Sequence, residues 1–218
     1  MTINAHLDHL VITAATLDEG CAFVLNSLGV EPGPGGSHEV MSTHNRLMRL
    51  GESMYLEVIA PNPIAQAPAR PRWFGMDVPG QLNKPRLATW VARTRSIAQI
   101  RQQLPVDPGP IHPMRRADWK WQITIPDDGL PALEGVLPTL IEWSDERHPT
   151  DLMPDAGCRL VCLELIHSDA TSVRRQLQAL NMSKVVEVRV CPSEEAPGLR
   201  AVIQTPWGER TIEGHWPE

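Results

Sequence analysis

The sequence of 218 residues lacks the features of a membrane protein or a nucleic-acid-binding protein. No apolar run approaches the roughly 20 residues that a membrane-spanning helix requires. Lysine and arginine never form a cluster longer than two adjacent residues, and the formal net charge is −6, so the basic patch that attracts a phosphate backbone is missing. We therefore expect neither a membrane nor a nucleic acid as a partner.

Cysteine is scarce, and its spacing does not indicate a metal or redox motif. No two of the four cysteines have the C-x-x-C spacing of a zinc knuckle or a thioredoxin-type site, so we expect reduced and mostly buried thiols. The first residues, MTINAHLDHLVIT, lack the cationic and apolar segments of a secretory signal peptide. We therefore expect a cytoplasmic location.

The motifs of several large enzyme classes are also missing, namely G-x-S-x-G, the P-loop and the dinucleotide fingerprint. Proline, in contrast, is abundant, with 21 residues against 15 glycines. The prolines concentrate in GVEPGPGG, APNPIAQAPARPR and LPVDPGPIHP, where they can neither continue a helix nor donate to a sheet. These segments are predicted to be loops.

Between the loops, short strand-like runs and helical runs recur in a fixed order. HLDHLVIT predicts a strand, and LDEGCAFVLNSL predicts a helix that Thr16 or Asp18 could cap and that Gly29 ends. SHEVMSTH, NRLMRL and SMYLEVIA follow as three runs of strand length. The first module is therefore predicted to be βαβββ.

The same order recurs twice more, in RLATWVART with SIAQIRQQL and in CRLVCLELIHS with SVRRQLQALN and VVEVRVC. Internal duplication is the simplest interpretation, with modules at approximately 5–60, 85–145 and 157–214. Because a small open sheet cannot bury both faces alone, such modules must pack together. We expect one α+β domain over 1–218, in which repeated βαβββ modules form curved mixed sheets around a concave pocket with helices on the outer face.

Strand periodicity selects the side chains that could face this pocket. In a regular first strand, Leu7, His9 and Val11 share one face and Asp8 lies on the other. In SMYLEVIA, the same alternation places Tyr55, Glu57 and Ile59 on one face of the strand. In SHEVMSTH, it places His38, Val40, Ser42 and His44 on one face. His9, His38 and Glu57 could therefore converge on one hollow.

Tryptophans and arginines form a second group of candidates. Trp119 and Trp121 share a strand face, and these two residues with Trp90 and Trp143 either line the pocket or fill the core between sheets. Arg115 or Arg116 could hold a substrate carboxylate through a bidentate contact.

Six segments in order resemble the glyoxalase-like domain family of the vicinal oxygen chelate superfamily, which also contains bleomycin-resistance proteins and dioxygenases. They are LDHLVI, GGSH, THNRLMRLG, YLEVIAPNP, MRRADWKWQIT and VLPTLIEWSDERHP. This resemblance extends over most of the chain. It implies the same cup-shaped fold and a small-molecule ligand.

The resemblance also implies roles for particular residues. Members commonly place a histidine on the first strand of a module and a glutamate on its last strand as ligands of a divalent metal, and here these positions are His9 and Glu57. The two residues would then be both catalytic and metal-binding, with Zn, Ni, Fe or Mn as the ion. The substrate-binding candidates are His38, Asn45, Tyr55, Trp90, Arg116, Trp119, Trp121 and Trp143.

The second module departs from this pattern, since Thr89 or Trp90 stands where a second histidine would be expected. Glu164, Glu209 or Glu213 could replace it, or could be ordinary surface carboxylates. Two functions therefore stay open, a metal-assisted lyase, isomerase or dioxygenase and a metal-free binding or sequestration protein like those that confer bleomycin resistance. We also expect a homodimer, because small sheets with open edges often complete a cup between chains.

Overall fold

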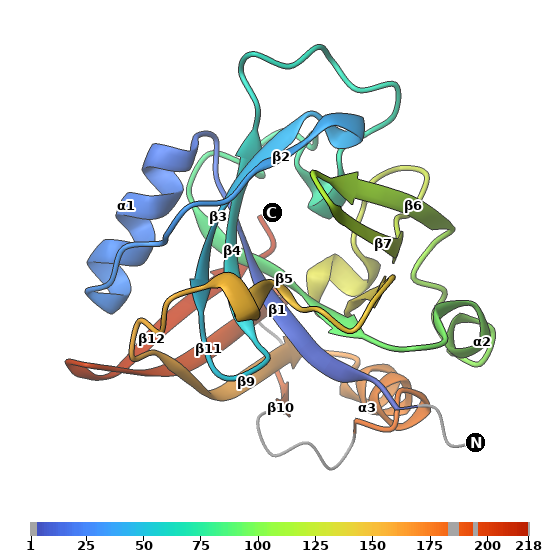
Figure 1. Ribbon diagram of the computed structural model, residues 1–218. Coiled ribbons are helices and arrows are strands. Elements are labelled where there is room, and N and C mark those ends of the chain that lie inside the picture. Colours follow the sequence, from blue (N-terminus) through green and yellow to red (C-terminus); the bar gives the residue numbers. More distant parts are fainter. Residues whose placement is uncertain (1–3, 183–187, 194–195, 218) are drawn as a thin grey trace.

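The computed structural model describes the chain except residues 1–3, 183–187, 194–195 and 218, and it begins with two βαβββ units (Figure 1). The first unit contains β1 (His6–Thr13), α1 (Leu17–Leu28), β2 (Ser37–His38), β3 (Thr43–Arg49) and β4 (Tyr55–Pro61). The second contains β5 (Arg86–Arg93), α2 (Ile97–Arg101), β6 (Ile111–Arg116), β7 (Trp119–Thr124) and β8 (Thr139–Trp143). Four short 3₁₀ turns accompany them, η1 (Glu39–Met41), η2 (Trp73–Gly75), η3 (Ala132–Gly135) and η4 (Pro149–Leu152).

The two units form one curved sheet with the strand order β2-β3-β4-β1-β5-β8-β7-β6. Within each unit the first strand pairs in parallel with the last, and the units join through the antiparallel pair β1–β5. The sheet curves until β2 contacts β6, so both halves of the cup come from one chain (Figure 1). This arrangement confirms the predicted α+β glyoxalase-like fold.

A third unit follows, with β9 (Arg159–His167), α3 (Ala170–Ala179), β10 (Val188–Pro192), β11 (Gly198–Thr205) and β12 (Gly208–His215). Its element order repeats that of the other units, but its sheet has the order β10-β9-β11-β12, and β9 pairs in parallel with the strand directly after the helix. The predicted strand VVEVRVC lies partly outside the described residues, and its remainder is β10.

The curved sheet has an apolar core on each side. On its outer side, Leu10 and Ile12 pack with residues of the second sheet such as Leu165 and Ala201, and α1 lies against β4 and β12. The inner side has a separate core that includes Val11. The second sheet therefore covers the convex face of the cup and leaves the concave face for the site. No helix in the described part of the chain is long and apolar enough to cross a bilayer.

Helix α1 forms as its sequence predicts. The Thr16 side chain accepts a hydrogen bond from the Glu19 N–H, which selects Thr16 over Asp18 as the cap. The helix ends at Gly29, whose φ of 74° lies in the left-handed region that glycine adopts without a steric cost.

Two predictions of which side chains share a strand face are wrong, each for a local reason. A β-bulge skips Asp8 in the pairing of β1 with β5, so Leu7 lies in the outer core with Leu10 while His9 lies on the concave side. The segment SHEVMSTH is not one strand, because the 3₁₀ turn η1 follows β2 directly and Ser42 has a φ of 51°. His38 therefore does not share a continuous strand face with the residues up to His44.

Candidate functional site

A small cavity lies inside the cup, between the strands of the two units. Its free volume is about 30 Å³, which is room for little more than a water molecule. Both units contribute to it, together with the loop that contains η2. The lining residues are His9, His38, Asn45, Tyr55, Glu57, Trp73, Phe74, Arg116, Trp121, Ile123, Ile141 and Trp143.

Glu57 and His9 face each other at this cavity from neighbouring strands. The distance from Glu57 Oε2 to His9 Nε2 is 3.6 Å, and both side chains are almost completely buried. Tyr55 stacks on the imidazole of His9 with ring centroids 4.4 Å apart, which fixes the plane of the ring. The carboxylate and the imidazole can therefore exchange a proton with one ligand or with each other.

Asp8 supports His9 from behind. Its Oδ1 accepts a hydrogen bond from His9 Nδ1 at 2.6 Å, and its Oδ2 accepts from His148 Nε2 at 3.1 Å and from Trp143 Nε1 at 3.0 Å. Because Asp8 holds the proton of His9 on Nδ1, the Nε2 atom toward the cavity is left as a proton acceptor. The bulge in β1 is what brings this carboxylate to the concave side.

Burial and hydrogen bonding set the charge states around the cavity. Burial alone would raise the pKa of Asp8, but hydrogen bonds from His148 and His9 outweigh it and hold that pKa well below its usual range. Burial raises the pKa of Tyr55 well above 10, and the nearby charges of Asp8 and Glu57 act in the same direction. Burial lowers the pKa of His38 to about 4, so His38 is neutral at pH 7.

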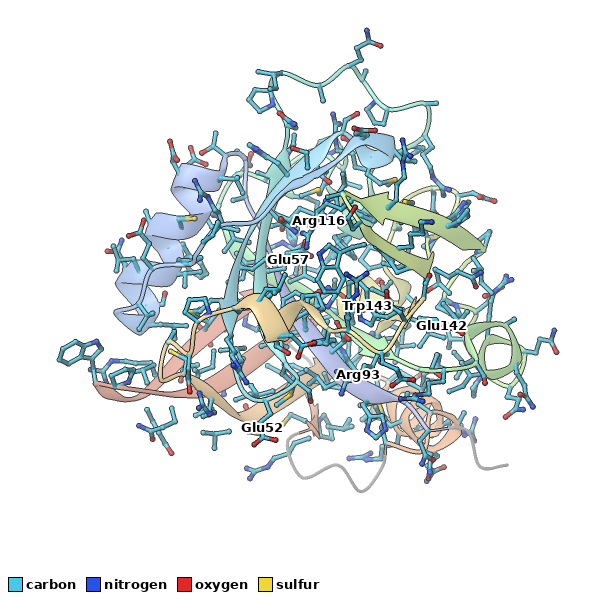
Figure 2. All side chains as sticks on the ribbon, in the orientation of Figure 1. Glu52, Glu57, Arg93, Arg116, Glu142 and Trp143 are labelled. Carbon is cyan, nitrogen blue, oxygen red and sulfur yellow. The ribbon has the colours of Figure 1, made fainter. Side chains whose placement is uncertain are left out.

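Asn45 orients the other oxygen of Glu57. Its Nδ2 donates to Glu57 Oε1 at 2.5 Å, while its Oδ1 accepts from Gly36 N at 2.8 Å and from Arg116 Nη1 at 3.1 Å. Gly35 permits this contact, because a Cβ at that position would overlap the backbone and side chain of Asn45. Figure 2 shows Glu57 and Arg116 near each other between β4 and β6.

Aromatic rings form much of the remaining wall. Trp73 and Phe74 stack with centroids 5.3 Å apart in η2, and the edge of His38 meets the Trp73 ring at 5.0 Å. Phe74 has a φ of 61°, a conformation that is uncommon for a residue other than glycine. The indole nitrogen of Trp73 is buried and has no hydrogen-bond partner among the described residues. This wall excludes bulk water from Glu57 and His9.

Most of the predicted site residues line the cavity, and two tryptophans do not. Trp90 lies in the outer core and donates through Nε1 to the Val136 carbonyl, so its proposed place in the pocket is corrected. Trp119 lines a neighbouring groove with Arg116. The others, His9, His38, Asn45, Tyr55, Glu57, Arg116, Trp121 and Trp143, meet at the cavity.

Four residues at the site were not predicted from the sequence. Asp8 was assigned to the opposite face, and His148 was not among the candidates. Trp73 and Phe74 follow a proline-rich segment that was predicted only as a loop. The sequence contained one signal for them, because two large aromatic residues stand side by side in a predicted loop. Such residues are seldom left in water, so they indicate a buried position.

The donor set does not complete a metal site of three or more protein ligands. His9 and Glu57 supply two facing donors, and the described residues contain no group of three His, Cys, Asp or Glu able to hold an ion. From β8 of the second unit, Ile141 faces the cavity, and its side chain has no atom that could bind a metal. Glu164 and Glu213 both form ion pairs with Arg200 on the second sheet.

The chain is similar to known proteins in sequence and in structure. The sequence profile of the glyoxalase-like domain matches residues 7–181. No curated protein matches the chain. Several solved structures resemble the chain at low identity, and three of them are as follows. A methylmalonyl-CoA epimerase from Mycobacterium tuberculosis is 16% identical, with 63% of this chain and 85% of that chain covered and a TM-score of 0.39.

The second, a Streptomyces coelicolor methylmalonyl-CoA epimerase in complex with 2-nitronate-propionyl-CoA, is 14% identical, with 68% and 100% covered and a TM-score of 0.42. The third, a variant of 4-hydroxymandelate synthase from Streptomyces coelicolor, is 13% identical, with 97% and 63% covered and a TM-score of 0.43. The profile match covers more than half of the chain and establishes the family. This chain therefore belongs to the glyoxalase-like domain family.

Proposed function

We propose that the protein binds a small oxygen-bearing molecule in the cavity and moves a proton on it, as a lyase or isomerase does. Glu57 is the base and His9 is its proton partner. The observation that carries this proposal is the alignment of Glu57, His9 and Asp8, with the first two facing one water-poor cavity and the third buried behind them. Such an arrangement is suited to general acid–base catalysis.

The hydrogen bonds divide the work among these residues. Because Asn45 donates to Glu57 Oε1, the other oxygen, Oε2, is the one available to take a proton from a C–H bond beside a carbonyl. A proton on Oε2 can pass to His9 Nε2, which lies 3.6 Å away, and the negative charge of Asp8 stabilises the imidazolium that results. The proton then returns to the ligand from either group.

Hydrogen exchange in D₂O tests this proposal directly. Wild-type protein is expected to speed incorporation of deuterium beside the carbonyl of pyruvate or hydroxyacetone, measured by proton NMR. Glu57→Gln keeps the shape but removes the base, so we expect at least a hundredfold loss of that rate, in line with general base catalysis. The matched control is Glu39→Gln on exposed η1, which should exchange as wild type. A wild-type rate equal to buffer would refute the proposal.

A second function is favoured by the aromatic wall. Trp73, Phe74, Trp121 and Trp143 can hold a flat or apolar molecule by packing alone, as a metal-free binding or sequestration protein would. In that case ligands would change the tryptophan fluorescence of wild type and of Glu57→Gln equally, and neither would exchange hydrogen. If the protein binds the ligand and also speeds hydrogen exchange in a way that depends on Glu57, the result supports the proton-transfer function instead.

Metal content is a separate prediction. Two facing donors are fewer than divalent metal sites use, so we expect much less than one Zn, Ni, Fe or Mn ion per chain after purification without chelator. Elemental analysis measures this. One ion per chain that disappears in both His9→Ala and Glu57→Ala would show that the pair recruits further ligands and that the reaction is metal-assisted.

A further inference from the structure

A larger groove lies beside the cavity and shares Arg116 with it. We call it the outer groove, and its volume is about 430 Å³. It is lined by the turn before β2, the β6–β7 turn and η4, with Pro34, Leu47, Arg116, Trp119, Leu152 and Met153 among its residues. The inner cavity offers about 30 Å³, so any ligand of more than a few atoms must extend beyond it.

Arg116 is the residue that lines both spaces. Its stem passes over Gly36, where a Cβ would come within 2.8 Å of the Arg116 Cδ, so the glycine makes room for it. Its Nη1 donates to Asn45, and no carboxylate in the described part of the chain forms an ion pair with it. The guanidinium therefore offers charge and N–H donors at the junction of the two spaces.

The rest of the outer groove is largely apolar. The Leu152 side chain is 77% exposed, and Met153, Leu47 and the Trp119 ring lie around the same hollow. The guanidinium of Arg147 lies 5.0 Å from the centre of the Trp119 ring and orients it. The apolar surface that these side chains leave accessible in the hollow favours binding of a ligand that covers it.

We infer that the ligand is a 2-oxo or 2-hydroxy carboxylic acid with an apolar side chain, an inference that rests on the function proposed above. The carboxylate pairs with Arg116 at the junction, the oxygen on the adjacent carbon points into the inner cavity toward Glu57 and His9, and the apolar side chain extends from that carbon into the outer groove. This placement follows from the position of Arg116, the only arginine or lysine among the described residues that line the two spaces, between a small cavity that contains Glu57 and His9 and a larger, mostly apolar groove.

The charge contact is tested with 4-methyl-2-oxopentanoate and its neutral methyl ester, with binding measured by calorimetry. Wild type is expected to bind the acid at least tenfold more tightly than the ester. Arg116→Gln should lose that preference by weakening the acid alone. Arg115→Gln is the matched control, because its neighbouring guanidinium is 77% exposed and should leave the preference intact. Equal effects of the two variants would overturn the role of Arg116.

The apolar contact is tested by comparing 4-methyl-2-oxopentanoate with pyruvate. Wild type is expected to bind the longer acid about tenfold more tightly. Trp119→Ala should reduce this difference in affinity without weakening the binding of pyruvate. Trp207→Ala, which removes an exposed tryptophan at the β11–β12 turn, should keep the difference. Equal affinity of wild type for both acids would overturn the outer groove as a binding site. Tight binding without hydrogen exchange would instead refute only the proton-transfer function.

Discussion

Replacement of Asp8 by alanine is expected to lower the free energy of unfolding by about 3–5 kcal/mol, the cost of removing one partner from a buried charged network. Asp8 is fully buried and accepts hydrogen bonds from three side chains, and Arg93 lies 3.8 Å from its Oδ2. Without it, the buried rings of His9 and His148 and the indole of half-buried Trp143 lose their acceptor. Urea unfolding at pH 7 measures the loss.

The matched control for this variant is Asp145→Ala. That carboxylate lies on the surface and pairs only with Arg147 in the hydrogen bonds described, so its removal should change stability little. Asp8→Asn keeps the volume and one acceptor, and is expected to fall between wild type and Asp8→Ala. Equal midpoints for Asp8→Ala and Asp145→Ala would show that the network does not stabilise the fold.

Acid is expected to destabilise the protein through His38. Burial lowers the pKa of this side chain from 6.5 to about 4 in the folded state, so between these values the unfolded chain binds a proton that the folded chain does not. Stability is therefore unaffected by His38 above pH 6.5 and falls as the pH drops toward 4. The difference between the two pKa values corresponds to a loss of about 3 kcal/mol.

The contribution of His38 is isolated with two variants. His38→Asn cannot titrate in this range, so its stability should fall by about 3 kcal/mol less than that of wild type between pH 7 and pH 4. His44→Asn is the control, because His44 is only partly buried and burial lowers its pKa less. The proposal about His38 fails if both variants show the wild-type dependence on pH.

The architecture could be predicted from the sequence because each module repeats its own local order of strand, helix and strands. Helix α1 shows this well, since Thr16 and Gly29 mark its ends in the sequence and in the structure. The strand order of the third unit could not be predicted in the same way. Strand order depends on pairing between segments far apart in the chain, and the local pattern of the third unit matches that of the first.

The sequence predicts the residues of the candidate site wherever the alternation of side chains along a strand decides which face of the sheet they occupy. His9 and Glu57 meet because alternation holds from His9 to Val11 in β1 and from Tyr55 to Glu57 in β4. Asp8 was missed because one extra residue in a bulge shifts the alternation, and the residue types in HLDHLVIT do not reveal it. Trp90 was misplaced because its hydrogen-bond partner, Val136, lies 46 positions away.

The homodimer stays a prediction, and gel filtration tests it. It is expected because small sheets with open edges often complete a cup between chains. The structure supplies both modules from one chain through the β1–β5 pair, so the cup closes without a second copy.

The second sheet has a consequence for any shortened form of the protein. The family profile ends at residue 181, before β11 and β12, yet these strands contribute Leu199, Ile203 and Ile212 to the core behind the cup. A fragment cut at that limit would leave Leu10 and Ile12 open to water on the reverse of the strand that carries His9. Strands β11 and β12 are thus a structural wall behind the cup that holds the candidate site.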